Sequence, residues 1–152
     1  NIPQLTGLPI THEMLRELVK VNNIRGVKDS TGDPASTRAF ISAFPGLAVF
    51  TGHDACSLQG LRDGAAGMIS GLANVFPSQV MDVWNAFGRG GGDVEQQFVS
   101  ALREALQGFP QRAASKYAGA TMNSAISLAR LSPGINGVRM ALPYAPSGRS
   151  HA

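Results

Sequence analysis

Short apolar runs alternate with polar loops and amphipathic segments along most of this chain. Three such runs, at 24–28, 47–51 and 67–70, each end in a polar loop. Because short runs without polar alternation are typical of strands covered on both faces, they predict buried parallel strands. The segments between them read as helices, so the order strand, loop, helix occurs three times. This order predicts βαβ units and an α/β fold.

The predicted helices carry recognisable end signals. Thr11 is expected to cap the first helix, and Asp33 followed by Pro34 is expected to begin the second. Asp93 is expected to cap a long helix that follows a glycine tract, 88–92, which we interpret as a linker. The predicted helical ranges are 11–21, 35–44, 55–62, 77–87, a long helix from 93, and 110–131.

Helical spacing also predicts which helix faces are buried. In the first helix the apolar face is expected to comprise Met14, Leu15, Leu18 and Val19. In the long helix it is expected to comprise Val94, Phe98, Ala101, Leu102, Ala105 and Leu106. The last twenty residues are rich in Pro, Gly and Ser and are expected to be irregular.

Composition agrees with a globular chain that has no charged binding surface. Of the 152 residues, 43% are hydrophobic and 15% are charged, and the formal net charge is +3. The arginines are scattered and no basic run alternates with aromatic residues, so we expect no nucleic-acid partner. A single cysteine, Cys56, excludes an internal disulfide and fits a reducing compartment.

Other classes are also disfavoured. No stretch has the length of a membrane span, and no signal peptide opens the chain, so we expect neither a membrane partner nor secretion. The chain begins at Asn1 without an initiator methionine. We therefore expect a processed protein or a fragment.

Lys28 is the first candidate for chemistry because it ends an apolar strand. Burial at that place would favour the neutral amine, which is a nucleophile. Lowering its pKa from about 10.4 to about 7.5 would require roughly 4 kcal/mol of differential interaction. The alternative is a surface lysine that pairs with Asp29 or Asp33, and spacing alone favours this alternative.

Two further strand ends carry polar or flexible residues. Gly52-His53-Asp54 could take part in acid–base work or metal binding, or could be a plain turn in which Asp54 caps the next helix. The segment 67–71, with Asn74, could bring backbone groups close to a small ligand, or its glycines could simply relieve packing. Because parallel strands place their chemistry at their carboxyl ends, these residues and Lys28 are expected at one edge.

Considered together, these segments resemble the dihydrodipicolinate synthase/N-acetylneuraminate lyase family of Schiff-base aldolases. The segment 24–33 is similar to the family's Schiff-base lysine motif, and the segment 1–7 resembles the end of its Tyr-Asn-x-Pro-x-x-[Thr/Ser]-Gly segment. Three more segments follow in family order, at 50–54, 64–74 and 138–143, the last with Ala141 in place of a proline. The resemblance covers nearly the whole chain.

The resemblance implies a fold and a division of the chain. The family fold is a (β/α)₈ TIM barrel followed by a small helical domain, and such a barrel typically needs about 250 residues. Residues 1–88 would supply strands six to eight of the barrel, and 93–152 would supply the C-terminal helical segment. The chain would therefore be the C-terminal half of the fold.

The resemblance also implies a mechanism without a metal or separate cofactor. Lys28 would form a covalent imine with pyruvate or another 2-oxo acid. Gly52 and Ile69 would line the pyruvate site through their backbones, and Ser30 and Asp54 would contact the rest of the substrate. Thr6 would also bind the substrate. The family's proton-relay tyrosine would lie immediately before Asn1, outside this sequence, and the carboxylate-binding loop would lie in the absent half.

Leu5 favours one branch of the family. Synthases that make dihydrodipicolinate usually carry an arginine at this position, and its loss removes a bidentate carboxylate contact. We therefore expect a lyase or aldolase that acts on a 2-oxo acid or sugar acid. The alternatives are 4-hydroxy-tetrahydrodipicolinate synthase and a catalytically silent half-barrel or sensor. The family further implies a cytoplasmic homo-oligomer, a tetramer when complete.

Overall fold

A three-stranded parallel sheet forms the framework of the computed structural model, which describes residues 1–21 and 23–107. Its strands are β1 (Gly26–Asp29), β2 (Ala48–Thr51) and β3 (Gly67–Met68), in the order β1-β2-β3. The three predicted strands and their parallel arrangement are confirmed.

The strands are shorter than the apolar runs that predict them. The third strand stops at Met68 rather than Ser70, and the Ser70 hydroxyl bonds to Asp54 in the loop after β2. The sheet continues past β1 through Asn1, whose nitrogen donates to the carbonyl oxygen of Lys28 at 2.7 Å. The carbonyl of Asn1 accepts a hydrogen bond from the nitrogen of Ser30 at 2.8 Å, which completes a parallel bridge.

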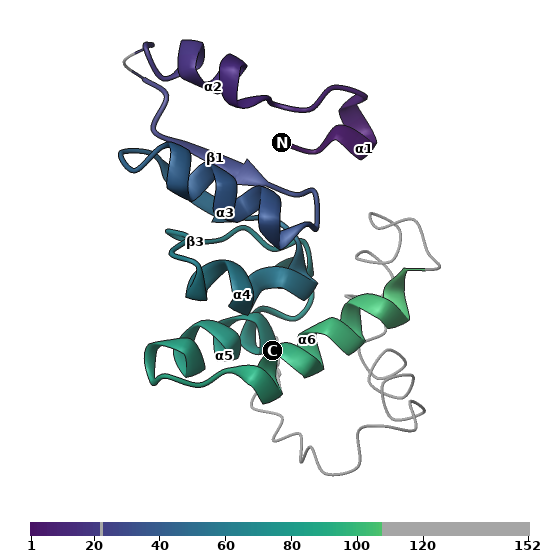
Figure 1. Cartoon of the computed structure of the whole chain (residues 1–152). Coiled ribbons are helices and arrows are strands. Elements are labelled where there is room, and N and C mark those ends of the chain that lie inside the picture. The colour runs from purple at the N-terminus through teal and green to yellow at the C-terminus, as the bar shows by residue number, and fades with distance from the viewer. Residues whose placement is uncertain (22, 108–152) are drawn as a thin grey trace, which may run out of the picture.

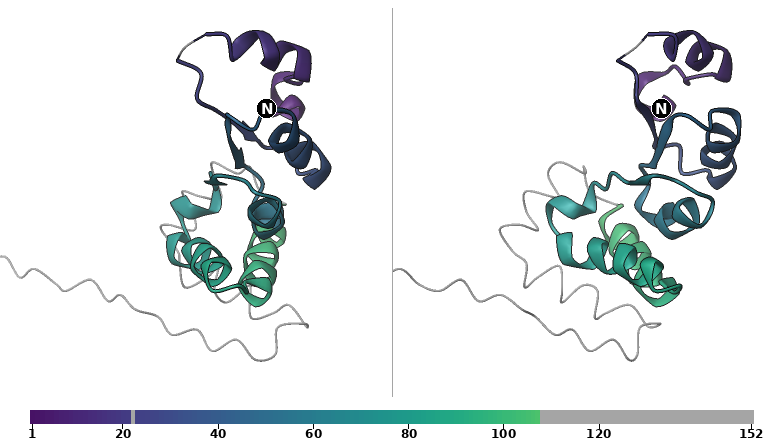
Figure 2. Two further views of the ribbon diagram at one scale, coloured as in Figure 1. Left: turned by 60° about the vertical axis from the view of Figure 1, so that its left-hand side comes forward. Right: turned by 90° about the vertical axis from the view of Figure 1, so that its left-hand side faces the viewer.

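Helices connect the strands and extend the fold beyond both edges of the sheet. Figure 1 shows the elements stacked in chain order, from α1 and α2 at the top to α5 and α6 at the bottom. Figure 2 shows α3 and α4 on the same side of the strands. The helices are α1 (Pro3–Thr6), α2 (His12–Leu18), α3 (Pro34–Ala43), α4 (Ser57–Arg62), α5 (Pro77–Gly88) and α6 (Asp93–Leu106), with 3-10 turns η1 (Asp54–Cys56) and η2 (Leu72–Asn74).

Two of the three predicted helix caps are confirmed. The Thr11 hydroxyl accepts a hydrogen bond from the nitrogen of Met14, and the Asp33 carboxylate accepts one from the nitrogen of Ala35. The cap predicted at Asp93 is wrong, because the preceding residue, Gly92, occupies that position with φ 116°. Asp93 is instead the first residue of α6, and its carboxylate pairs with Arg62 at 2.8 Å.

Two hydrophobic clusters hold the described residues together. One lies where α2 and α3 pack on the strands and comprises Leu15, Val27, Phe40, Phe44 and Val49. The other joins α4, α5 and α6 and comprises Leu58, Leu72, Val75, Phe76, Val80, Val83, Val99 and Leu102. Because α6 shares this second core with α4 and α5, the helix is packed against both. The division between 1–88 and 93–152 stays a prediction.

The buried faces of two helices are narrower than helical spacing predicts. In α2 only Leu15 is buried, and the other predicted core residues, Met14, Leu18 and Val19, are exposed. In α6 the predicted core residue Val94 is 64% exposed, whereas Leu102 is buried. Spacing identifies a face, but the extent of its burial depends on which neighbours cover it.

The glycine tract is an ordered turn rather than the predicted linker. Gly91 donates its N–H to the carbonyl of Ala86 at 2.9 Å, and Gly92 lies against the buried side chain of Leu58. The turn therefore folds α6 back onto α5. The predicted helix 110–131 and the family-like segment 138–143 lie outside the described residues.

Candidate active site

The carboxyl ends of the three strands meet at one edge, as the parallel arrangement predicts. Lys28 lies at the end of β1, Gly52 directly after β2, and Ile69 directly after β3. Gly52 donates its N–H to the carbonyl of Asp29 at 2.7 Å, and Ile69 donates to the carbonyl of Thr51 at 2.9 Å. These two hydrogen bonds fix the exits of neighbouring strands against each other.

Lys28 and Gly52 are in close contact. A Cβ atom placed on Gly52 would overlap Cε of Lys28 and Oγ of Ser30, and would lie 2.9 Å from Cγ of Lys28. The stem of the half-buried lysine therefore crosses directly over the glycine, with the Ser30 hydroxyl beside it. Because any side chain at position 52 would occupy this space, the glycine is needed for the course of the lysine.

Lys28 does not behave as the surface lysine that spacing alone favoured. The Lys28 amine forms no ion pair with Asp29 or Asp33 among the described residues. The buried carboxylate of Asp29 instead accepts hydrogen bonds from the hydroxyls of Thr37 and Thr31, at 2.9 and 3.1 Å. These neutral donors, with the Asn1 side-chain amide at 3.0 Å, occupy Asp29. Within 1–21 and 23–107, no carboxylate forms an ion pair with the lysine amine.

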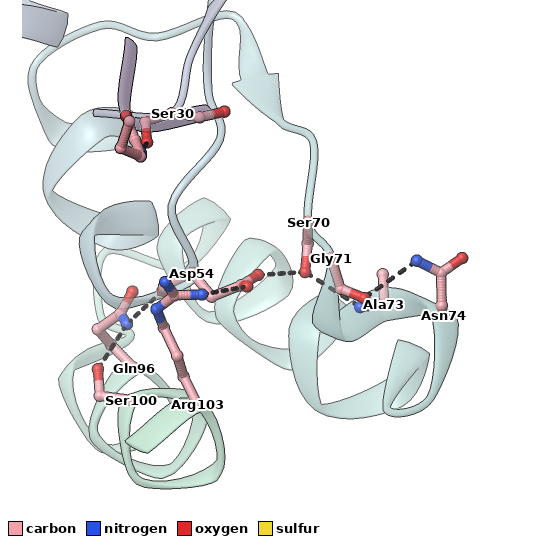
Figure 3. A network of polar contacts seen from close by, with 10 residues as sticks. Ser30, Asp54, Ser70, Gly71, Ala73, Asn74, Gln96, Ser100 and Arg103 are labelled. Carbon is pink, nitrogen blue, oxygen red and sulfur yellow. Dashed lines mark hydrogen bonds and ion pairs between the residues drawn. The ribbon is translucent and has the colours of Figure 1, made fainter. Parts of the chain in front are cut away.

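Asp54 joins the exits of two strands to α6, as Figure 3 shows. Its carboxylate is buried and accepts a hydrogen bond from the hydroxyl of Ser70, which follows β3. On its other side lies Arg103 of α6, with Nη1 3.6 Å from a carboxylate oxygen. The interpretation of Asp54 as a helix cap is wrong, because its side chain is directed to these partners and Cys56 precedes α4.

The side-chain amide of Gln96 binds the backbone of the same turn. Its oxygen accepts a hydrogen bond from the nitrogen of Leu58 at 2.8 Å, and its nitrogen donates to the carbonyl of Asp54 at 2.9 Å. The same nitrogen donates to the hydroxyl of Ser100 at 3.0 Å. Figure 3 shows Gln96 and Arg103 approaching Asp54 together from α6.

Two titratable groups near this network are shifted by burial. Burial lowers the pKa of His53, and the nearby Arg103 guanidinium lowers it further against the opposing effect of Asp54. Burial raises the pKa of the Cys56 thiol, whose sulfur donates to the carbonyl of Gly32 at 3.3 Å. Neutral His53 and Cys56 are therefore favoured at neutral pH. No group of three or more His, Cys, Asp or Glu residues with metal-site spacing occurs within 1–21 and 23–107.

The remaining predicted site residues lie at different distances from Lys28. Ser30 is buried beside Gly52, and its carbonyl accepts a hydrogen bond from the Gln4 side chain at 2.7 Å. Ile69 is 45% exposed at the exit of β3. Thr6 is exposed at the end of α1, where its hydroxyl bonds only to nearby backbone. The structure therefore brings Lys28, Ser30 and Gly52 together and leaves Thr6 outside this group.

The contribution of α6 to this edge was not predicted from the sequence. Gln96, Ser100 and Arg103 recur at a spacing of four and three residues, which places polar groups on one helical face. Two of them reach Asp54. A polar row beside the apolar row of an amphipathic helix was the available signal, although nothing in the sequence identified its partner.

These features define an α/β protein of parallel βαβ units, with a candidate site at the strand ends, where TIM barrels also carry their active sites. The sequence matches the Dihydrodipicolinate synthetase family over residues 1–150. The chain belongs to this family. Members with solved structures share its α/β fold with a parallel sheet.

Individual relatives support the assignment. The chain is 39% identical over 108 residues to an uncharacterized DapA-like lyase of Chloroflexus aurantiacus, covering 68% of this chain and 36% of the relative. It is 38% identical over 90 residues to the 4-hydroxy-tetrahydrodipicolinate synthase of Corynebacterium aurimucosum, covering 59% and 30%. The sialic acid aldolase of Ruminococcus gnavus has a similar fold, with a TM-score of 0.75 at 20% identity over 86% of this chain and 51% of that protein.

The chain spans less than half the length of the curated relatives it matches. The curated relatives include proteins named as lyases. No helix within the described ranges has the length and apolar character needed to cross a membrane.

Proposed function

We propose that the protein carrying this chain is a class I lyase that forms a Schiff base between Lys28 and pyruvate or a larger 2-oxo acid. One observation carries the proposal. The stem of Lys28 crosses Gly52, beside the Ser30 hydroxyl, at the edge where three strand exits meet. A half-buried lysine at a strand end, with no carboxylate partner in the described part of the chain, is suited to act as a nucleophile.

The proposed reaction needs no separate cofactor. The neutral amine of Lys28 adds to the keto carbon, and loss of water gives an iminium ion. A base takes the proton of the C4 hydroxyl as the bond between C3 and C4 of the substrate breaks, so that C4 leaves as an aldehyde. The electron pair of the broken bond enters the iminium system and forms an enamine. Protonation of the enamine and addition of water then release pyruvate and the free lysine. We assign the backbones of Gly52 and Ile69 to the pyruvate end of the substrate.

We also propose that the chain is the C-terminal half of a TIM barrel, with strands six to eight followed by a helical segment. The parallel order of the three strands supports this interpretation, as do the structural matches that cover about half of each relative. The proton-transfer group would come from the other half. Under this proposal the isolated chain is catalytically silent, and the complete protein is a cytoplasmic homo-oligomer.

A second candidate function is 4-hydroxy-tetrahydrodipicolinate synthase, the activity for which the Corynebacterium relative is named. Leu5 argues against it, because this exposed apolar side chain cannot bind the carboxylate of the synthase's aldehyde substrate. Condensation of that aldehyde with pyruvate, measured beside cleavage of N-acetylneuraminate, separates the two functions. Faster condensation than cleavage would favour the synthase.

Trapping the imine tests the principal proposal. The protein carrying the chain is incubated with pyruvate and borohydride, and the Lys28 peptide is expected to gain the mass of a reduced pyruvyl group. The Lys20 peptide is the internal control, since Lys20 is exposed and paired with Glu17 at 2.7 Å. An unmodified Lys28 peptide, or equal modification of both lysines, would reject the proposal. Retro-aldol activity of residues 1–152 alone would reject the silent half-barrel.

A further inference from the structure

Helix α6 contacts the turn after β2 through Gln96, which satisfies two backbone groups of that turn. A backbone N–H can only donate and a carbonyl can only accept, so the contacts to Leu58 and Asp54 fix which way the Gln96 amide points. The third contact, to Ser100 on the same helix, holds the side chain in that orientation. The Gln96 side chain therefore forms a bridge between α6 and the turn after β2, and its three contacts fix the orientation of its amide.

This bridge supplies a helix cap that the local sequence lacks. The residue before α4, Cys56, makes no side-chain cap hydrogen bond. The N–H of Leu58 lies in the first turn of α4, where backbone donors have no partner within the helix. Gln96 accepts this hydrogen bond from a position 38 residues further along the chain. The start of α4 thus depends on the placement of α6.

The same bridge fixes the turn that faces Lys28. Its donor end holds the carbonyl of Asp54, two residues after Gly52, and Gly52 lies directly under the lysine stem. The carboxylate of Asp54 is tied to Ser70 and lies beside Arg103. The segment from Gly52 to Asp54 is therefore fixed on one side by β1 and on the other by α6.

We infer that Gln96 is a positioning residue, which sets the Gly52–Asp54 turn for pyruvate without touching the substrate. The inference rests on the proposed Schiff-base function. Lys28 belongs to β1 and is placed by strand hydrogen bonds, so loss of Gln96 leaves the nucleophile present and displaces the opposite wall. The maximum extent of adduct formation is then unchanged, while the pyruvate concentration for half-maximal trapping rises.

A matched pair of variants on one helix tests this assignment. Gln96→Leu removes both backbone contacts, whereas Gln97→Leu changes the adjacent residue, which is exposed on the same helix. Hydrogen exchange of the Leu58 amide is expected to accelerate in Gln96→Leu and to stay unchanged in Gln97→Leu. The half-saturating pyruvate concentration is expected to rise about tenfold in Gln96→Leu only, because small displacements of a positioning group have effects of this size.

Several results would overturn the inference. Unchanged Leu58 exchange in Gln96→Leu would show that the bridge does not hold α4, whatever the activity of the protein. If Leu58 exchanges faster in Gln96→Leu, but the half-saturating pyruvate concentration is the same in Gln96→Leu and Gln97→Leu, Gln96 contributes to stability alone. If Gln96→Leu does not fold, Gln96→Glu replaces it in the test. This variant keeps the acceptor for the Leu58 N–H and loses the donor to the Asp54 carbonyl. The Leu58 amide is then expected to stay protected from exchange, while the half-saturating pyruvate concentration still rises. Absence of any adduct in the protein without substitutions would instead reject the proposed function.

Discussion

Replacing Gly52 by alanine tests directly whether the course of Lys28 over the strand exit matters for chemistry. The added methyl group would overlap Cε of Lys28 and Oγ of Ser30, and would lie 2.9 Å from Cγ of Lys28. The atoms that can yield belong to side chains, and those of the lysine are the most flexible. We therefore expect the methyl group to displace the lysine rather than the sheet.

The size of the effect follows from the cost of turning the lysine. A side chain forced away from its preferred rotamer costs about 0.5–1.5 kcal/mol, and 1.36 kcal/mol corresponds to about a tenfold change in population. The rate of imine formation at Lys28 in Gly52→Ala is thus expected to fall about tenfold. Crowding is expected to lower the free energy of unfolding by about 1–3 kcal/mol.

The assay is the initial rate of borohydride trapping with pyruvate, measured per folded molecule. Gly67→Ala is the matched control at the next strand, since its methyl group would meet only Phe50 at an ordinary 3.4 Å. Gly26→Ala controls for lost stability, because its methyl group would meet the carbonyl oxygen of Ala48 at 2.6 Å. We expect Gly67→Ala to trap normally and Gly26→Ala to lose stability but trap normally once folded. If the imine is trapped in Gly52→Ala at the same rate as in the protein without substitutions, the reasoning is refuted.

Three further predictions concern stability. Thr37→Val removes a buried hydrogen bond to Asp29 and is expected to lower the free energy of unfolding in urea by about 1–3 kcal/mol. Leu102→Ala is expected to cost about 2–5 kcal/mol by the same measurement, whereas Val94→Ala, on the exposed side of α6, is expected to leave stability almost unchanged. Because burial lowers the pKa of His53, the unfolded chain binds the proton more tightly than the folded chain. The free energy of unfolding is therefore expected to fall as the pH drops below about 6.5. His53→Phe is expected to weaken this pH dependence, measured by thermal unfolding.

The parts of the fold that the sequence predicts are those decided by neighbouring residues. Asp33 and Pro34 mark the start of α3 because the cap and the fixed proline backbone act within one turn. The cap predicted at Asp93 is wrong, and the partner of its side chain lies far away in the sequence. Its carboxylate pairs with Arg62, 31 residues earlier, while Gly92 takes the cap position in a left-handed conformation. Local patterns cannot anticipate a partner that only tertiary packing brings near.

The candidate site shows the same division. The meeting of Lys28 and Gly52 follows from parallel strands, because their carboxyl ends must lie at one edge. The role of α6 does not follow, since the contact between Gln96 and Leu58 depends on how the second hydrophobic cluster seats the helix. A periodic row of polar residues identifies a face, but only the packed structure shows that the face meets the turn after β2.

Asp54 illustrates how burial changes the meaning of a predicted substrate contact. Its carboxylate is almost fully buried, and its oxygens are engaged by Ser70 and approached by Arg103. Under the proposed function, a substrate hydroxyl can bond to this buried carboxylate by replacing the Ser70 hydroxyl, since loss of that donor without a replacement would cost about 1–3 kcal/mol. Such an exchange is nearly neutral for a substrate whose hydroxyl reaches the vacated position and unfavourable for one that lacks it. Asp54 would then select among 2-oxo acids by the hydroxyl they present, while Lys28 and Gly52 treat their common pyruvate end alike.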